Sequence, residues 1–172
     1  EMLRSLVGSE MCIRDSAVSL GEIERALLAG FSPVDAGIVF TCDLFDEATL
    51  ARVVELQVEV NTGSIDMLRQ LGEKSPGHRV WLRINPGFGH GHSRKTNTGG
   101  ENSKHGIWHD QMSEALAVIR QHGLHLVGLH MHIGSGVDYD HLEQVGAAMV
   151  AAVKSLDLSL IHISEPTRLL SI

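Results

Sequence analysis

Residues 123–136, with the sequence GLHLVGLHMHIGSG, constrain the fold more than any other stretch of the chain. Their apolar residues recur with a period of two, which predicts a buried strand. Gly128, His130 and His132 then share one face, so the strand carries polar groups to its carboxyl end. The opposite face is purely aliphatic, which predicts that it lies under helices. That face consists of Val127, Leu129, Met131 and Ile133.

A Gly-Ser-Gly turn, formed by Gly134, Ser135 and Gly136, follows this strand directly. Glycine lets the backbone turn with its N–H groups exposed, a hydroxyl lies beside them, and a helix is predicted just afterwards. This combination suits a phosphate group. The turn alone does not identify a ligand, because most turns of this kind only reverse the chain.

Composition narrows the class of protein. The chain has 172 residues, of which 43% are hydrophobic, and no apolar run reaches the roughly 18 residues that a membrane span needs. The formal charge of −7 and the lack of a basic stripe argue against nucleic acid and anionic membranes as partners. Two cysteines, Cys12 and Cys42, form no disulfide framework, which favours a reducing cytoplasm.

Both ends of the chain are set apart from the fold prediction. Residues 1–16 and 158–172 resemble sequencing-adaptor DNA translated in frame, and such segments are excluded from fold reasoning. The alternative is that they are a genuine arm and tail. The expected organisation is therefore a central domain over residues 17–157, which would be an internal piece of a longer protein.

Strand and helix patterns alternate through the central domain. Ser19 and Glu22 have the spacing of a capping box, and Gly30 and Gly72 read as helix stops. Helices are predicted over residues 17–30, 46–56, 64–71, 110–122 and 138–155, and strands over 37–43, 58–64, 78–87 and 123–133. Strands that alternate with helices over short connections predict a parallel sheet with right-handed crossovers.

Polar residues gather at the carboxyl ends of four successive predicted strands. They are Thr41 and Asp43, Asn61, Arg83 and Asn85, and His130 and His132. Parallel α/β folds place their sites at this edge, although strands that run out into solvent also end in polar residues. The chain lacks the Rossmann glycine fingerprint and has a small inward residue, Gly128, which favours a (β/α)8 barrel. A closed barrel takes about 250 residues, so we expect a partial TIM barrel with four to five βα units.

A polar, glycine-rich insertion, residues 86–106, follows the third predicted strand. An insertion of this length is either an active-site or interface loop or a disordered segment, and its position after a strand end favours a functional loop. His90 and His92 suggest a metal, but no cysteine or carboxylate stands at ligand spacing, so a solvated loop is the preferred interpretation.

Four segments carry a specific resemblance: VSLGEIERALLAGF, VNTGSIDMLRQLG, GHRVWLRINPGFGHGHSRKTNTGGENSKHGIW and LVGLHMHIGSGVDYDHLEQV. Together they resemble the bacterial diaminopimelate decarboxylases, and the insertion is their most discriminating part. The resemblance implies an alanine-racemase-like (group IV decarboxylase) barrel, the cofactor pyridoxal 5′-phosphate and a homodimer. It also implies an amino-acid substrate, meso-2,6-diaminopimelate, which is converted to L-lysine and CO2.

The resemblance also assigns roles to single residues. His132 corresponds to the histidine that stacks on the cofactor ring, and Arg83 to a barrel arginine near that ring. Ser135, with the backbone of Gly134 and Gly136, corresponds to part of the phosphate cradle. The structural alternatives are a buried core histidine at position 132 and a barrel ion pair, with Asp43 as partner, for Arg83. His130 is expected to pack behind the site, and Lys104 to have a structural role in its K-x-G turn.

The departures from the family pattern concern catalysis. The family's Schiff-base lysine lies on an earlier strand, and none of the lysines in the central domain matches its motif; these are Lys74, Lys95, Lys104 and Lys154. The downstream glycine triplet, the acid that faces the pyridine nitrogen, and the substrate-contacting cysteine and tyrosine are also missing. We therefore assign no catalytic residue and expect the chain by itself to be inactive.

Three other interpretations stay open. A decarboxylase of the same fold could act on ornithine, arginine or carboxynorspermidine. His130-x-His132 places two imidazoles on one strand face, as a metal-dependent barrel hydrolase requires, although Asp43 is the only further ligand at a strand end. A non-catalytic homologue is the third. Under each, an incomplete barrel exposes strand edges, so we expect the isolated chain to aggregate.

Overall fold

A computed structural model describes residues 15–34, 37–88, 103–132 and 139–156 of the chain. Its strands are β1 (Asp15–Ala17), β2 (Ile38–Cys42), β3 (Glu59–Thr62), β4 (Arg79–Asn85), β5 (Ile107–Trp108) and β6 (His125–Met131). Its helices are α1 (Leu20–Leu28), α2 (Glu47–Leu56), α3 (Ile65–Lys74), α4 (Met112–His122) and α5 (Tyr139–Ser155). A 3-10 turn, His109–Gln111, leads into α4.

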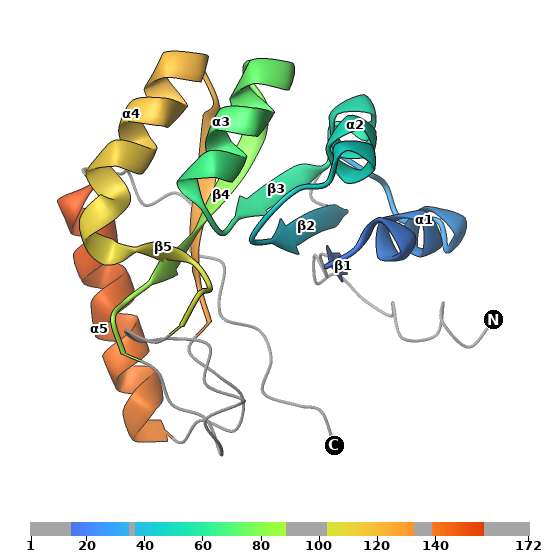
Figure 1. The fold of residues 1–172 in the computed structure, drawn as a ribbon. Coiled ribbons are helices and arrows are strands. Elements are labelled where there is room, and N and C mark those ends of the chain that lie inside the picture. Colours follow the sequence, from blue (N-terminus) through green and yellow to red (C-terminus); the bar gives the residue numbers. More distant parts are fainter. Residues whose placement is uncertain (1–14, 35–36, 89–102, 133–138, 157–172) are drawn as a thin grey trace.

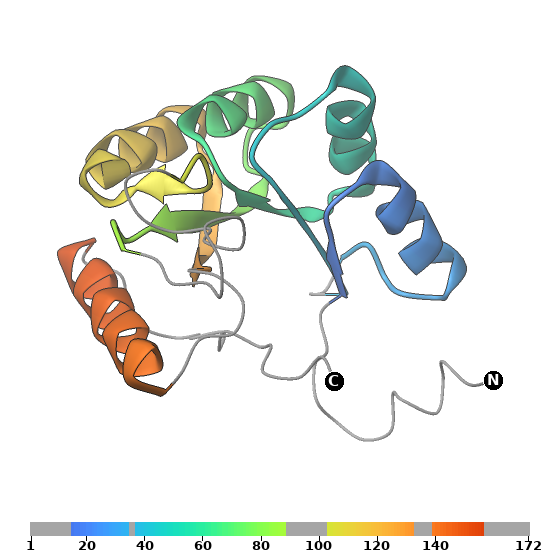
Figure 2. The same ribbon diagram turned by 60° about the horizontal axis from the view of Figure 1, so that its bottom comes forward.

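All strand pairs in the described part of the chain are parallel. The strands follow the order β1-β2-β3-β4, β6 pairs with β4, and the short β5 pairs with the carboxyl end of β4. The helices form an arc around one face of the curved sheet, and the other face is turned to the concave side (Figures 1 and 2). Five βα units of a partial barrel are therefore present, as the sequence predicted.

Two short strands were not expected from the sequence. β5 has two residues and β1 three, which is too short for an alternating pattern. β1 includes Asp15 and Ser16, which belong to residues 1–16, the segment excluded from the fold prediction. β1 nevertheless pairs in register with β2. The boundary at residue 17 stays a prediction, and residues 1–14 and 157–172 lie outside the described part.

Three helices begin where the sequence predicts. Ser19, Asp46 and Ser64 have extended backbones, and each side chain accepts a hydrogen bond from the backbone N–H three residues later. At α1, Glu22 reaches back to accept from the N–H of Val18, at 2.6 Å. In the usual capping box this glutamate accepts from the N–H of the N-cap residue, whereas here it accepts from the residue before the N-cap.

The prediction that Gly72 ends a helix was wrong, because α3 continues to Lys74. A β-carbon at Gly72 would lie 2.5 Å from both Cβ and Cγ of His122 in α4. Gly72 therefore allows two neighbouring helices to approach closely. Glycine in a helix interior indicates either a stop or a close contact, and here it is the contact.

The main hydrophobic core lies between the outer face of the sheet and the helices. Val60, Leu82 and Ile84 point outward and are at most 2% exposed, and they pack with Met67, Leu68 and Leu71 of α3. The aliphatic face of β6 is buried at Leu129 and Met131, as expected. Nonpolar burial of this kind is the main stabilising contribution to such a layer.

The inner face of the sheet is partly filled by Trp81. Its indole N–H donates to the buried carboxylate of Glu59 at 2.8 Å, and Arg79 donates to the other oxygen of that carboxylate, also at 2.8 Å. A β-carbon at Gly128 would lie 2.2 Å from the Trp81 ring. The inward position predicted for Gly128 is confirmed, and its small size is what admits the tryptophan ring.

None of the helices among the described residues is long and apolar enough to cross a membrane.

Candidate active site at the carboxyl ends of the strands

Strand register brings the predicted polar residues to one end of the inner face. Thr41 of β2 pairs with Asn61 of β3, which pairs with Trp81 of β4. Two residues nearer the carboxyl end of β4, Arg83 lies opposite His130 of β6. Because side chains alternate along a strand, Arg83 and His130 share the face that also carries Trp81. The expected convergence of polar strand ends is therefore present in the structure.

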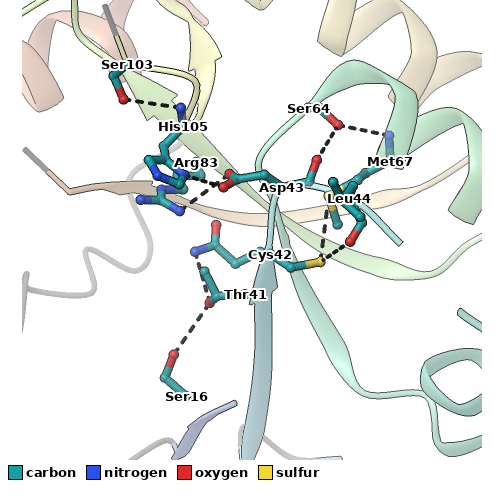
Figure 3. Close-up of polar contacts among 11 residues, drawn as sticks. Ser16, Thr41, Cys42, Asp43, Leu44, Ser64, Met67, Arg83, Ser103 and His105 are labelled. Atoms are coloured by element: carbon teal, nitrogen blue, oxygen red, sulfur yellow. Dashed lines mark hydrogen bonds and ion pairs between the residues drawn. The ribbon is translucent and has the colours of Figure 1, made fainter. Parts of the chain in front are cut away.

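Asp43, directly after β2, joins two of these groups (Figure 3). One carboxylate oxygen accepts from Nη1 of Arg83 at 3.5 Å, and the other pairs with Nδ1 of His105. The side chains of Arg83 and Asp43 are 12% and 25% exposed. The ion pair that the sequence offered as the structural alternative for Arg83 is thus present, and it lies inside the cluster of polar strand ends.

Two glycines leave room for this arrangement. A β-carbon at Gly63 would lie 2.1 Å from Oδ1 of Asp43, so a larger residue would displace the carboxylate. Gly106 has a φ of +82°, which favours glycine, and a β-carbon there would press on the backbone of β4 at 3.1 Å. Gly106 thereby brings the preceding residue, His105, close to the strand ends.

The pKa values of two imidazoles, those of His130 and His132, are lowered. Burial, together with the positive charges of Arg83 and of a protonated His132, lowers the pKa of His130 to about 4. Burial also lowers the pKa of His132, and Arg83 and His105 add to that effect. At neutral pH the site therefore has one guanidinium, one carboxylate and uncharged imidazoles at positions 130 and 132.

Two buried polar atoms have no hydrogen-bond partner among the described residues: Oδ1 of Asn61 and Nδ1 of His130. The Asn61 amide donates to Oγ1 of Thr41 at 3.3 Å, which turns its oxygen away from that hydroxyl. Asn61 is 3% exposed. Buried polar atoms normally have a partner, so these two atoms mark the inner face as a place that receives a polar group.

The structure tests only the placement of the predicted site residues. Arg83 and His132 lie close enough to interact electrostatically. Ser135, Gly134 and Gly136 lie outside the described residues, as do His90 and His92. His105 was not predicted, and its one sequence signal is that it precedes Gly106 in the K-x-G turn of the insertion.

A cavity of about 320 Å³ lies at the start of α3, next to the Asp43 cluster, because Gly63 and Gly106 also line it. Gly63, Ser64, Lys104 and Ile107 are among the residues that line it, and Arg83, His130 and His132 are not. Lys104 therefore belongs to a neighbouring surface. The structural role expected for that lysine stays a prediction.

Within the described ranges, no three His, Cys, Asp or Glu side chains come together as a metal ion would require. The two imidazoles of His130 and His132 thus have no third ligand in that part of the chain. Asp43, the one carboxylate that the sequence offered, is occupied by Arg83 and His105.

Comparison with known families identifies the class of protein. The profile of the family described as pyridoxal-dependent decarboxylase, pyridoxal binding domain, matches residues 10–164. The chain belongs to this family of pyridoxal-dependent decarboxylases, whose cofactor is pyridoxal phosphate. The match agrees with a site that has a cation and neutral imidazoles at the carboxyl ends of parallel strands.

Several proteins that the chain resembles are named diaminopimelate decarboxylase. The chain is 67% identical over 146 residues to the diaminopimelate decarboxylase of Escherichia coli (strain K12), covering 84% of this chain and 35% of that protein. A crystal structure of diaminopimelate decarboxylase is 61% identical with a TM-score of 0.81, covering 91% of this chain and 39% of that one. The resemblance seen in the sequence and the expected fold class are confirmed.

A mutant of the Helicobacter pylori diaminopimelate decarboxylase, solved with L-lysine, is 25% identical with a TM-score of 0.79. That comparison covers 90% of this chain and 40% of that one. The chain thus spans a little over a third of the length of the relatives that it matches.

Proposed function

We propose that the chain is the middle of the barrel of a diaminopimelate decarboxylase, which removes CO2 from meso-2,6-diaminopimelate and releases L-lysine. The observation that carries this proposal is the convergence of Arg83, His130 and His132 at one end of a parallel sheet, in a chain of the pyridoxal-dependent decarboxylase family. The identity of 67% with the Escherichia coli enzyme supports the choice of substrate.

The residues present fit pyridoxal phosphate. Arg83 is a largely buried cation whose one hydrogen-bonding partner within the described ranges is Asp43, and a single contact of 3.5 Å leaves most of its donors for another group. The orphaned oxygen of Asn61 and ring nitrogen of His130 add sites for a polar ligand. We assign the cofactor ring to His132 and Arg83, and its phosphate to Ser135, Gly134 and Gly136.

The charges of His132 and Arg83 determine how each would contact the cofactor ring. A neutral imidazole at His132 offers a flat, uncharged surface on which an aromatic ring can stack, whereas an imidazolium would repel a cationic pyridine ring. Arg83, held by Asp43, directs a fixed positive charge at the site. When bound, pyridoxal phosphate supplies the sink for the electron pair that remains after the carboxylate departs as CO2.

The chain alone is proposed to be inactive, because no lysine in it matches the family's Schiff-base position. In the same proposal the parent enzyme is a cytoplasmic homodimer that takes a small amino-acid substrate. Residues 17–157 are its genuine barrel segment, and residues 1–16 and 158–172 do not belong to it.

The test is to recover the complete gene from the source DNA and to express its product with pyridoxal phosphate. We expect CO2 and L-lysine from meso-diaminopimelate, and much slower turnover of ornithine and arginine. The matched control is Glu24→Gln, which breaks an ion pair with Arg52 on the outer helices and should leave turnover unchanged. Absence of lysine from a protein that binds the cofactor would reject the proposed substrate.

A further inference from the structure

Asp43 connects three segments that are distant in the sequence. It follows β2, its Oδ1 pairs with Arg83 on β4, and its Oδ2 pairs with His105 at the end of the insertion. Figure 3 shows the guanidinium and the imidazole ring on the same side of this carboxylate, each joined to it by a dashed line. A carboxylate can accept from two partners at once, so a single side chain can set the positions of both.

The position of Asp43 is itself fixed by its surroundings. Oγ of Ser64 donates to the backbone carbonyl of Asp43 at 3.1 Å, and the absent side chain of Gly63 leaves the space that Oδ1 occupies. Ser64 is also the N-cap of α3, and its oxygen accepts from the N–H of Met67. The backbone of Asp43 is thus attached to the start of a helix, which fixes the point from which its carboxylate extends.

The position of the Arg83 guanidinium depends on its contact with Asp43. Its side chain is 12% exposed, and within the described part of the chain Asp43 is its one hydrogen-bonding partner. A long side chain with several rotatable bonds loses entropy when it is fixed in one geometry. A partner that fixes it before a ligand arrives removes part of that cost from binding.

We propose that Asp43 is a positioning residue for the cofactor: it aims the guanidinium of Arg83 at the ring and holds His105 beside it. This inference rests on the proposed function. Asp43 acts on cofactor binding through Arg83 and does not itself touch the cofactor. Replacing it should therefore weaken cofactor binding only as long as Arg83 is present.

A double-mutant cycle in the full-length enzyme separates this role from a structural one. Asp43→Asn keeps the shape of the side chain but removes its charge. We expect it to raise the dissociation constant for pyridoxal phosphate, measured by absorbance, by about tenfold, a size usual for coupled neighbours. In an Arg83→Met background the same substitution should change that constant less than about twofold.

Loss of general stability would give a different pattern, because Asp43→Asn would then weaken binding equally in both backgrounds. That result overturns the inference, and so does an Arg83→Met variant that binds the cofactor normally. Asp43→Ser, which is smaller and keeps an oxygen, gives the same test if the asparagine variant does not fold. A wild-type enzyme that binds no pyridoxal phosphate would instead reject the proposed function.

Discussion

Arg83 on β4 lies directly across from His130 on β6, so a permanent positive charge faces an imidazole on the inner face of the sheet. The pKa of His130 is lowered to about 4, first because the ring is buried and then because of Arg83 and His132. A histidine in this position stays neutral at every physiological pH. Its neutrality follows from the burial of the ring and from the positive charge that β4 places opposite it.

The first prediction concerns acid stability. Because the folded state holds the pKa of His130 near 4 and the unfolded chain binds a proton near 6.5, the unfolded state binds more protons between these values. The contribution of His130 is fully present above pH 6.5, and it falls by up to about 3 kcal/mol as the pH drops to 4. We expect His130→Gln in the full-length enzyme to flatten the dependence of the unfolding free energy on pH in that window.

Histidine resonances provide the check. In protein labelled at histidine, the ring signals of His130 should titrate near pH 4, well below the range usual for a histidine in water. A midpoint above 6 would contradict the burial and the charge environment described for this ring.

The second prediction concerns Gly128. A methyl group there would lie 2.2 to 2.8 Å from three ring atoms of Trp81, and this ring is held by Glu59 and is 5% exposed. Gly128→Ala should therefore lower the unfolding free energy of the full-length enzyme by about 1 to 3 kcal/mol or more. Gly146→Ala in α5 is the control, because no atom lies within 4 Å of its new methyl group. Equal stabilities for the two variants in urea would contradict the predicted contact.

The third prediction concerns the contact between α3 and α4. Alanine normally stabilises a helix interior by about 1 kcal/mol relative to glycine, but at Gly72 it would overlap His122 at 2.5 Å. Overpacking costs about 1 to 3 kcal/mol, so Gly72→Ala should be destabilising overall. Adding His122→Gly, which removes both overlapping atoms, should make the alanine at position 72 favourable, which thermal unfolding of the two single variants and the double variant would show.

The fourth prediction concerns the thiol of Cys42. Burial raises its pKa from about 9 to about 12, and its S–H donates to the carbonyl of Leu44 at 3.0 Å. In the native full-length enzyme at pH 8, Cys42 should react with iodoacetamide about a thousandfold more slowly than a free thiol. Mass spectrometry before and after denaturation measures this, and rapid native labelling would show that the thiol is accessible.

Much of the site could be read from strand alternation. Arg83 and His130 were assigned to one face because strands place every second residue on the same side, and the register of β4 and β6 brings them opposite each other. The helix starts at Ser19, Asp46 and Ser64 were also predictable, because capping is a local interaction.

The rest depends on contacts between distant residues. His105 lies 62 residues after Asp43 in the sequence, at the end of a loop without periodicity. No local sequence pattern therefore predicts that the two residues pair. The sequence around Gly72 predicts a helix stop, because the sequence does not show that His122 packs against it. β5 has two residues, and a strand of that length leaves no pattern.

The position of β5 also bears on how the insertion can change. Ile84 of β4 pairs with Met131 of β6 and with Ile107 of β5, so the chain returns to the strand that it left only about twenty residues earlier. A loop whose two ends meet on one strand can gain or lose residues without moving the strands on either side. Related proteins could therefore vary the middle of this loop over evolution while Arg83, Asp43 and His130 keep their positions at the neighbouring strands.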